Sequence, residues 1–229
     1  MFGPDVNDAA RAHAIEAWPK EACGIVVDGV YKRARNTARD PEQTFRMPAN
    51  TFAMRDVQAV IHSHCEPAHG PWPSAADMRG QLDTAVPWGI VWTDGQTARE
   101  PLWLGEHTLD ADLLGRPFRP GVYDCYALVR AWYWRELGVK LPEFPRDADW
   151  WHAGGNLLAD GFEPAGFRAV DDIRVGDVLL MQIRSKVPNH CAVALDNGLM
   201  LHHLENRLSA REVMGRFLPF VTHRLRHVG

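Results

Sequence analysis

The first half of the chain alternates short extended apolar runs with stretches of helical spacing. Residues 5–17 are predicted to form a helix, with Asp5 or Asn7 near its N-cap. Asp28-Gly29 lies between two apolar runs and is a strong hairpin signal. The two runs are residues 23–28 and 30–35. Four further elements follow: strands at 57–62, 88–92 and 101–104, and a helix from Ser74 to about Asp83. Strands interleaved with helices predict an α/β layered domain.

The second half of the chain has a different order, with a helix first and strands after it. The helix is predicted to begin near Asp124 and to end at Leu137, with Gly138 as its C-cap. Apolar residues keep helical spacing along it, which indicates one buried face. After a loop-rich stretch, strands are predicted at 177–183, 190–195 and 199–204, with Asp-Asn-Gly as the turn between the last two. This order is typical of an α+β domain.

A segment rich in Gly, Pro and charged residues separates the two halves. Residues 105–121, GEHTLDADLLGRPFRPG, interrupt the succession of helices and strands. The halves show no internal repeat. We therefore predict two domains, at residues 1–108 and 115–229.

Composition narrows the classes of protein and partner. With 229 residues, 46% hydrophobic and 24% charged, the chain is typical of a folded protein. The net charge of -4 gives no reason to expect nucleic acid or an anionic membrane as a partner. No apolar run approaches the ~20 residues that cross a bilayer, and the first thirty residues show no secretion signal. We therefore expect the protein to be made and folded in a cytoplasm.

Cys125 is the cysteine whose surroundings indicate chemistry. The four cysteines have no CxxC spacing, so free thiols are expected. If Asp124 caps the predicted helix, Cys125 lies in its first turn, where unpaired N–H groups and the helix dipole favour a thiolate. The spacing to Leu128 and Val129 directs the sulfur inward, against the sheet that follows. A catalytic cysteine also needs a base, and a third group that orients the base.

Three histidines in the predicted strands are candidate partners of Cys125. His190 begins the second of these strands. His202 and His203 point to opposite faces of the next strand, so only one of them can face the thiol. The same alternation turns Cys191 away from His190, as a core or back-face residue.

Several ordered motifs in this half resemble the NlpC family of cell-wall cysteine peptidases, whose fold is papain-like. Residues 123–129, YDCYALV, resemble the Asp-Cys-Ser-Gly-Leu-Val nucleophile helix of that family. Residues 175–180, VGDVLL, resemble its Gly-Asp-Leu-Val strand. His190 with the apolar strand after it, the Asn-Gly turn and His202 match the remainder.

The NlpC resemblance implies a role for each of these residues. Cys125 would be the nucleophile, His190 its base and His202 the orienting residue, and the spacing across the turn selects His202 over its neighbour. The implied reaction is hydrolysis of peptidoglycan stem peptides, with no cofactor. Tyr126-Ala127 replaces the common Ser-Gly, which changes the pocket wall but removes no catalytic group.

A second constellation, in the first half of the chain, has the residue types of a metal site. His62 and His64 are two residues apart on an extended segment, so both imidazoles point the same way and reach one ion. Asp77, in the first turn of the following helix, can supply a third ligand. Catalytic zinc sites keep an open position for water. Glu21, just ahead of an apolar strand, is a candidate for acting on that water.

These pieces, in this order, resemble the JAMM/MPN metallopeptidase pattern: Pro-Lys-Glu-Ala-Cys-Gly, then His-Ser-His, then Ser-x-x-Asp. The resemblance implies a cytidine deaminase-like layered fold with zinc as cofactor. His62, His64 and Asp77 would be the zinc ligands. Glu21 would be the general base, and Ser74 would help to hold the oxyanion.

The loop after the two histidines departs from that pattern. Cys65 replaces the usual Pro, and the loop 65–73 is about two residues longer than is common in the family. Strand alternation turns Cys65 away from the metal position, so we expect a bystander. Ser63, between the two histidines, is expected to serve the local structure.

The two resemblances, taken in order, match the architecture of lambda-type phage tail-assembly peptidases. This implies phage tail-tip proteins and peptidoglycan stem peptides as partners, the host cytoplasm as the location during assembly, and the virion tail tip if the protein is retained. The expected function is cysteine-dependent hydrolysis of stem peptides, with a zinc isopeptidase-like site for protein processing. Two alternatives stay open: a structural tail-tip component with vestigial sites, and a host cytoplasmic peptidase.

Overall fold

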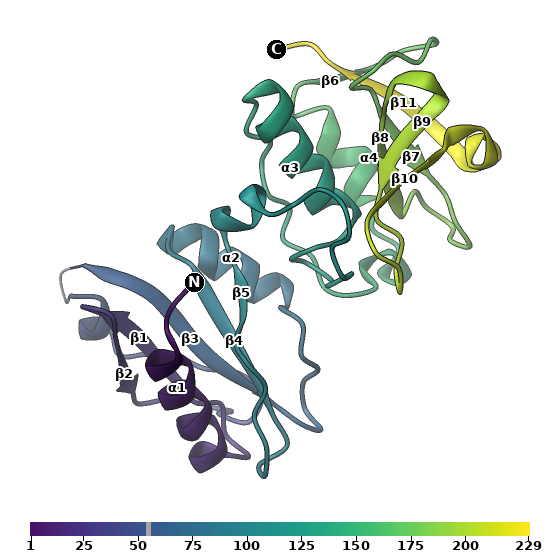
Figure 1. Ribbon diagram of the computed structural model, residues 1–229. Helices are drawn as coiled ribbons and strands as arrows, with labels where there is room; N and C mark the ends of the chain where they lie inside the picture. Colours follow the sequence, from purple (N-terminus) through teal and green to yellow (C-terminus); the bar gives the residue numbers. More distant parts are fainter. Residues whose placement is uncertain (54–55) are drawn as a thin grey trace. The chain divides into compact units, whose positions relative to one another are not determined.

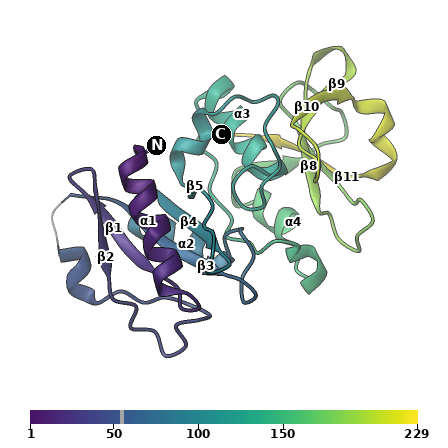
Figure 2. The same ribbon diagram turned by 60° about the horizontal axis from the view of Figure 1, so that its bottom comes forward.

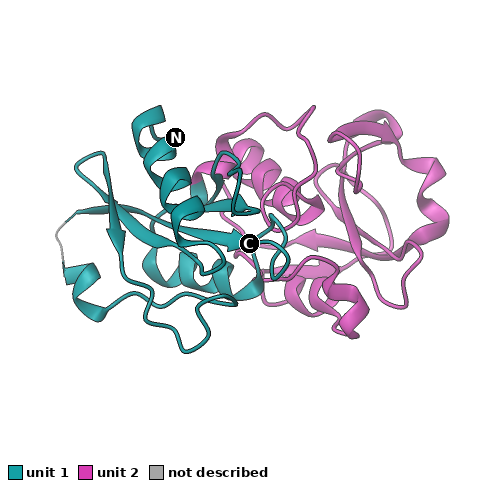
Figure 3. Ribbon diagram, turned by 90° about the horizontal axis from the view of Figure 1, so that it is seen from below, with its two compact units in different colours: residues 1–106 teal, residues 107–229 magenta. Residues whose placement is uncertain are grey.

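The structure is a computed structural model that describes residues 1–53 and 56–229. These residues form two compact units, 1–106 and 107–229, which are teal and magenta in Figure 3. The domain limits predicted from the sequence, 1–108 and 115–229, differ slightly from this division and remain a prediction. Among the described residues, none of the helices has the length and apolar character needed to span a membrane.

The first unit is a five-stranded sheet with a helix against each face (Figures 1 and 2). Its elements are α1 (Pro4–Ala17), β1 (Cys23–Val27), β2 (Val30–Ala34), a 3-10 helix (Ala49–Ala53), β3 (Val57–Cys65), α2 (Ala75–Thr84), β4 (Trp88–Thr93) and β5 (Leu102–Leu104). The strand order is β2-β1-β3-β4-β5. The β3–β4 pair is parallel, and the other pairs are antiparallel.

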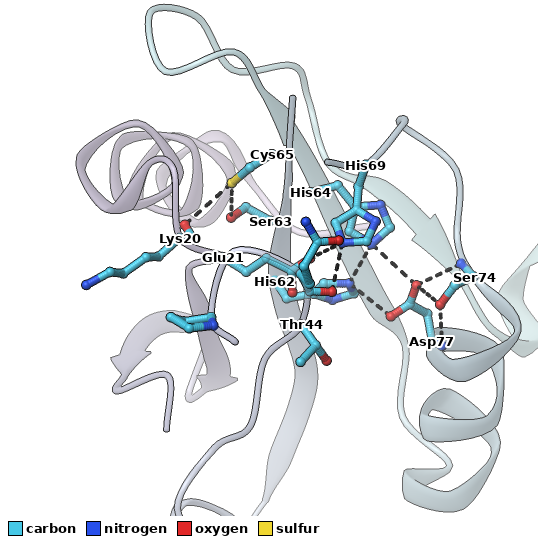
Figure 4. Close-up of polar contacts among 12 residues, drawn as sticks. Lys20, Glu21, Thr44, His62, Ser63, His64, Cys65, His69, Ser74 and Asp77 are labelled. Carbon is cyan, nitrogen blue, oxygen red and sulfur yellow. Dashed lines mark hydrogen bonds and ion pairs between the residues drawn. The ribbon is translucent and has the colours of Figure 1, made fainter. Parts of the chain in front are cut away.

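Strand β3 divides its side chains between the two helices. Ile61 belongs to the apolar cluster formed with α1. By alternation, His62 and His64 point to the opposite face, toward α2 (Figure 4). Helix α2 lies close to this face: a Cβ at Gly80 would come within 2.3 Å of the Trp88 ring. The two histidines are therefore buried between the sheet and α2.

The second unit is a six-stranded antiparallel sheet preceded by its longest helix. Its elements are α3 (Cys125–Leu137), α4 (Leu157–Phe162), β6 (Phe167–Ala169), β7 (Val178–Met181), β8 (His190–Ala194), β9 (Leu199–His202), β10 (Ala210–Val213) and β11 (Val221–His227). Short 3-10 helices lie at Glu106–Asp110, Trp150–Ala153, Asp196–Gly198, Met214–Arg216 and Leu218–Phe220. The strand order is β10-β9-β8-β7-β11-β6, with every pair antiparallel.

Helix α3 covers one face of this sheet, and the two together form the main core. Leu128 and Val129 of α3 pack in one buried cluster with Leu180 of β7 and Val193 of β8. The opposite face has a smaller cluster, which includes Met181, and the segment after β10 packs against it. The sheet therefore has two covered faces, and the first turn of α3 lies over the end of the sheet where β8 begins.

The sequence predicted this architecture correctly: an α/β layered domain is followed by an α+β domain. The predicted helix caps of the second half are confirmed, because Asp124 is the N-cap of α3 and Gly138 is its left-handed C-cap. In the first helix, Gly3 is the N-cap and Pro4, with its preset φ, begins α1. Asp5 lies in the first turn, near the cap as predicted.

Candidate active sites

In the first unit, the three predicted metal ligands converge on one point (Figure 4). His62 Nε2 lies 3.1 Å from Asp77 Oδ1, and His64 Nε2 lies 3.3 Å from Asp77 Oδ2. The two Nε2 atoms are 3.1 Å apart. All three side chains are buried, and their ligand atoms lie within 4.8 Å of one another. Two imidazole nitrogens and one carboxylate are a donor set that suits zinc with an open position.

Hydrogen bonds around these ligands fix their orientation. His64 Nδ1 donates to the carbonyl of Gly70 at 2.9 Å, which leaves Nε2 as the nitrogen that faces Asp77. Burial lowers the pKa of His62, and the neutral ring that results is the form that binds metal. The hydroxyl and the backbone N–H of Ser74 both donate to Asp77 Oδ2, each at 2.7 Å, in a capping box. Ser74 thus orients Asp77 here, and its expected contact with an oxyanion stays a prediction.

Glu21 lies just before β1, beside the three candidate ligands. Its side chain is 3% exposed, and burial raises its pKa to about 8; the Asp77 carboxylate adds to the rise, and His64 opposes it. Ser63 sets this position, because its hydroxyl accepts a 2.7 Å hydrogen bond from the N–H of Ala22. The structural role expected for Ser63 is therefore confirmed.

The long loop after β3 contributes one residue that the sequence did not single out. His69 Nε2 lies 3.6 Å from Glu21 Oε1 and donates to the carbonyl of Gln43 at 2.7 Å. Its ring centroid is 5.2 Å from that of His64. Cys65 points the other way, as predicted, with its sulfur 3.4 Å from the Lys20 carbonyl (Figure 4). The loop therefore adds an imidazole beside Glu21 and no thiol.

In the second unit, Cys125 is the first residue of α3 and lines a cavity of about 650 Å³. The pKa of the Cys125 thiol is held well below its usual range by a hydrogen bond from Cys191, and then by a hydrogen bond and the positive charge of His190. The charge of Asp124 acts in the opposite direction. Cys191 was expected either in the core or on the back face of the sheet, and it lies in the core beneath α3. The surroundings of Cys125 therefore favour the thiolate form of its side chain.

His190 and His202 lie side by side on adjacent strands. His190 Nε2 is 3.2 Å from His202 Nδ1, and both rings are buried. Because Nε2 of His190 contacts His202, Nδ1 is the nitrogen left for Cys125. His202 is held in turn by Glu212 of β10, whose Oε1 lies 3.6 Å from His202 Nε2, and by the Phe217 ring at 4.8 Å. Burial lowers the pKa of His202 to about 4, so its ring is neutral. Glu212 carries no sequence signal and was missed.

His203 occupies the opposite face from His202, as alternation predicts. It lines the cavity together with Cys125, and its ring contacts Phe118 at 5.1 Å between centroids. Its Nε2 donates to the Arg207 carbonyl at 3.2 Å. Only one of the two histidines was expected to face the thiol, and that residue is His203. His202 instead lies behind His190.

Comparison with known proteins finds relatives for both units. Residues 115–226 match the NlpC/P60 family, and residues 4–104 match the prokaryotic homologs of the JAB domain. Tail tip assembly protein K of Escherichia phage N15 is 32% identical over 223 residues, which cover 92% of this chain and 88% of that protein. Tail tip assembly protein K of Escherichia phage lambda is 38% identical over 159 residues, covering 69% and 74%. The NlpC/p60 domain of the peptidoglycan hydrolase SagA has a TM-score of 0.35 at 18% identity, covering 50% of this chain and 89% of that one.

Proposed function

Because the chain belongs to the family of tail tip assembly protein K, we propose that it acts in phage tail assembly and hydrolyses peptide bonds at two separate sites. The second unit is a cysteine peptidase for peptidoglycan stem peptides, and the first is a zinc metallopeptidase that processes a protein or isopeptide bond. Other tail-tip proteins are its partners, first in the host cytoplasm and then, if it is retained, at the virion tail tip.

The arrangement of Cys125, His190 and His202 carries this proposal. The Cys125 thiolate attacks the scissile carbonyl, and His190 gives a proton to the leaving amine. His202 keeps the His190 ring turned toward the sulfur. The N–H groups at the start of α3 that Asp124 does not bind would face the oxygen that becomes negative. His190 then takes a proton from the water that releases the product.

The first unit has its own chemistry, in which His62, His64 and Asp77 would hold the zinc ion. When bound, zinc polarises the scissile carbonyl and makes water acidic. Glu21 accepts the proton of that water and passes it to the leaving nitrogen. Burial raises the pKa of Glu21 to about 8 in the metal-free protein, and the positive charge of a bound ion would lower that pKa toward the range of a general base.

Muropeptide digestion tests the cysteine site. Purified wild type should release stem-peptide fragments that mass spectrometry detects, and Cys125→Ala should release none. Cys65→Ala is the matched control, because Cys65 is a buried thiol of the first unit and should leave the digestion unchanged. Undiminished digestion by Cys125→Ala would remove Cys125 as the nucleophile.

A structural role is the second candidate, and it is favoured by the description of both phage relatives as assembly proteins. In that case the two sites are vestigial. A protein that binds no zinc when expressed with it, and whose Cys125 reacts with iodoacetamide no faster than an ordinary thiol, would favour this candidate over the enzyme.

A further inference from the structure

Asp124, the N-cap residue of α3, accepts more hydrogen bonds than the capping of a helix requires. Asp124 Oδ1 accepts from the N–H of Ala127 at 2.9 Å, which is the ordinary capping bond. Asp124 Oδ2 accepts from the N–H of Gly121 at 2.9 Å. Arg146 also donates to both oxygens, with Nε 2.8 Å from Oδ2 and a terminal nitrogen 2.9 Å from Oδ1. Asp124 is 7% exposed and Arg146 4%, so this bidentate ion pair is shielded from water.

The charge of Asp124 creates a conflict with the residue that follows it. A carboxylate directly before Cys125 repels a thiolate there, and the repulsion is strong because both groups are buried. The guanidinium of Arg146 supplies the opposite charge on the carboxylate itself. Its remaining donor group binds Glu143 Oε1 and the Phe144 carbonyl, each at 2.6 Å. All three guanidinium nitrogens of Arg146 therefore donate to protein groups.

The segment that carries Arg146 is fastened to α3 along its length. We name residues 141–146 the strap. Tyr126 donates its hydroxyl to the Pro142 carbonyl at 2.6 Å and stacks on Phe144 at 4.5 Å between centroids. Arg130 donates from Nε to the Leu141 carbonyl at 3.1 Å and pairs with Glu143. Tyr126, which replaces the Ser of the family pattern, is thus one of the strap's attachments.

We propose that Arg146 is a positioning residue for the nucleophile: it holds Asp124 in its capping geometry and cancels the charge that this cap places beside the Cys125 thiolate. The proposal rests on the proposed role of Cys125. Three other ionisable groups approach the sulfur from packed elements: His190 and Cys191 from β8, and His203 from the residue after β9. None of these is on the strap. The charge of Arg146 also acts on Cys191, so the part of its effect that passes through Asp124 is isolated by the double variant below.

Alkylation of the full chain by iodoacetamide across a pH series measures the thiol pKa without any substrate, and peptide mass spectrometry isolates the Cys125 signal from the other cysteines. In Arg146→Met, alkylation at a pH below the thiol pKa should slow about tenfold, since a pKa higher by about one lowers the thiolate fraction by that factor. Arg130→Met is the matched control. It removes an equally buried arginine that shares Glu143 but does not touch Asp124, so its pH profile should follow wild type.

The double variant Asp124→Asn/Arg146→Met separates charge from structure. Asn still caps a helix but carries no charge, so the alkylation profile should return toward wild type. If Arg146→Met does not fold, Arg146→Lys takes its place: it keeps the charge, loses the bidentate bond and should slow alkylation less than tenfold. An unchanged profile in Arg146→Met, an equal change in Arg130→Met, or no return in the double variant would each overturn the proposal. An ordinary thiol pKa in wild type would instead count against the proposed function.

Discussion

Replacing Glu21 by Gln should change how the stability of the metal-free protein depends on pH. Burial raises the pKa of Glu21 from its ordinary value of 4.5 to about 8 in the folded chain. Below pH 4.5 the carboxyl is protonated in both the folded and the unfolded chain, so it favours neither. Between 4.5 and about 8 the unfolded chain has lost the proton while the folded chain keeps it. The free energy of unfolding of wild type therefore falls as pH rises through this window.

The magnitude follows from the two pKa values. The loss is about 1.4 kcal/mol for each pH unit crossed, and about 5 kcal/mol over the whole window. Gln has no proton to lose, so the variant should show none of this slope. His62, whose pKa burial lowers, gains stability as pH rises, but it is present in both proteins and cancels in their difference.

The assay is urea unfolding in EDTA, followed by tryptophan fluorescence, for wild type and Glu21→Gln at several pH values from about 4 to about 9. The second unit is the same in both proteins, so the difference between the two curves belongs to the first. The variant should gain on wild type by about 5 kcal/mol as pH rises. A difference that stays constant with pH would refute the description of Glu21 as a buried carboxyl that is neutral without metal.

Three further predictions concern other groups. Elemental analysis should find about one zinc per chain, absent in Asp77→Asn and kept in Glu21→Gln, because only the first removes a ligand; loss of zinc in Glu21→Gln would make Glu21 a ligand. His202→Ala should lower the rate of muropeptide hydrolysis by orders of magnitude, since His190 loses its orienting partner. His203→Ala leaves the His190–His202 contact intact and should lower the rate far less; the reverse result would contradict the assignment. Phe162→Ala should lower the urea-unfolding free energy by about 3–5 kcal/mol, because a fully buried ring is lost; an unchanged midpoint would count against the described core.

The sequence predicted correctly the features that depend on local backbone geometry. The spacing of His62 and His64 places them on one face of β3, and the Asp before Cys125 caps α3, because both relations depend only on neighbouring backbone geometry. The strand β3 continues to Cys65, beyond the predicted end at residue 62, since the polar histidines are buried and paired like apolar residues. An argument from periodicity that takes a histidine as the polar end of a strand does not detect these three additional residues.

Contacts between distant segments were out of reach of the same reasoning. Arg146 and Glu212 look like surface charges in the sequence, and only the folded chain brings them to Asp124 and His202. His69 stands in a loop with no periodicity. Strand β11 escaped notice because Leu225 is its one buried residue, so it lacks an apolar signature. Each of these depends on tertiary placement and not on local spacing.

The strand order of the second unit has a consequence for how the protein is made. Strand β11 is later in the chain than every other strand of its sheet, yet it lies between β7 and β6. Strand β6 pairs only with β11, so this edge of the sheet has no partner until residues 221–227 have left the ribosome. Vectorial synthesis therefore completes the first unit well before the second, whose sheet stays incomplete until β11 has emerged. A chain interrupted before residue 221 loses two strands from the sheet and not one.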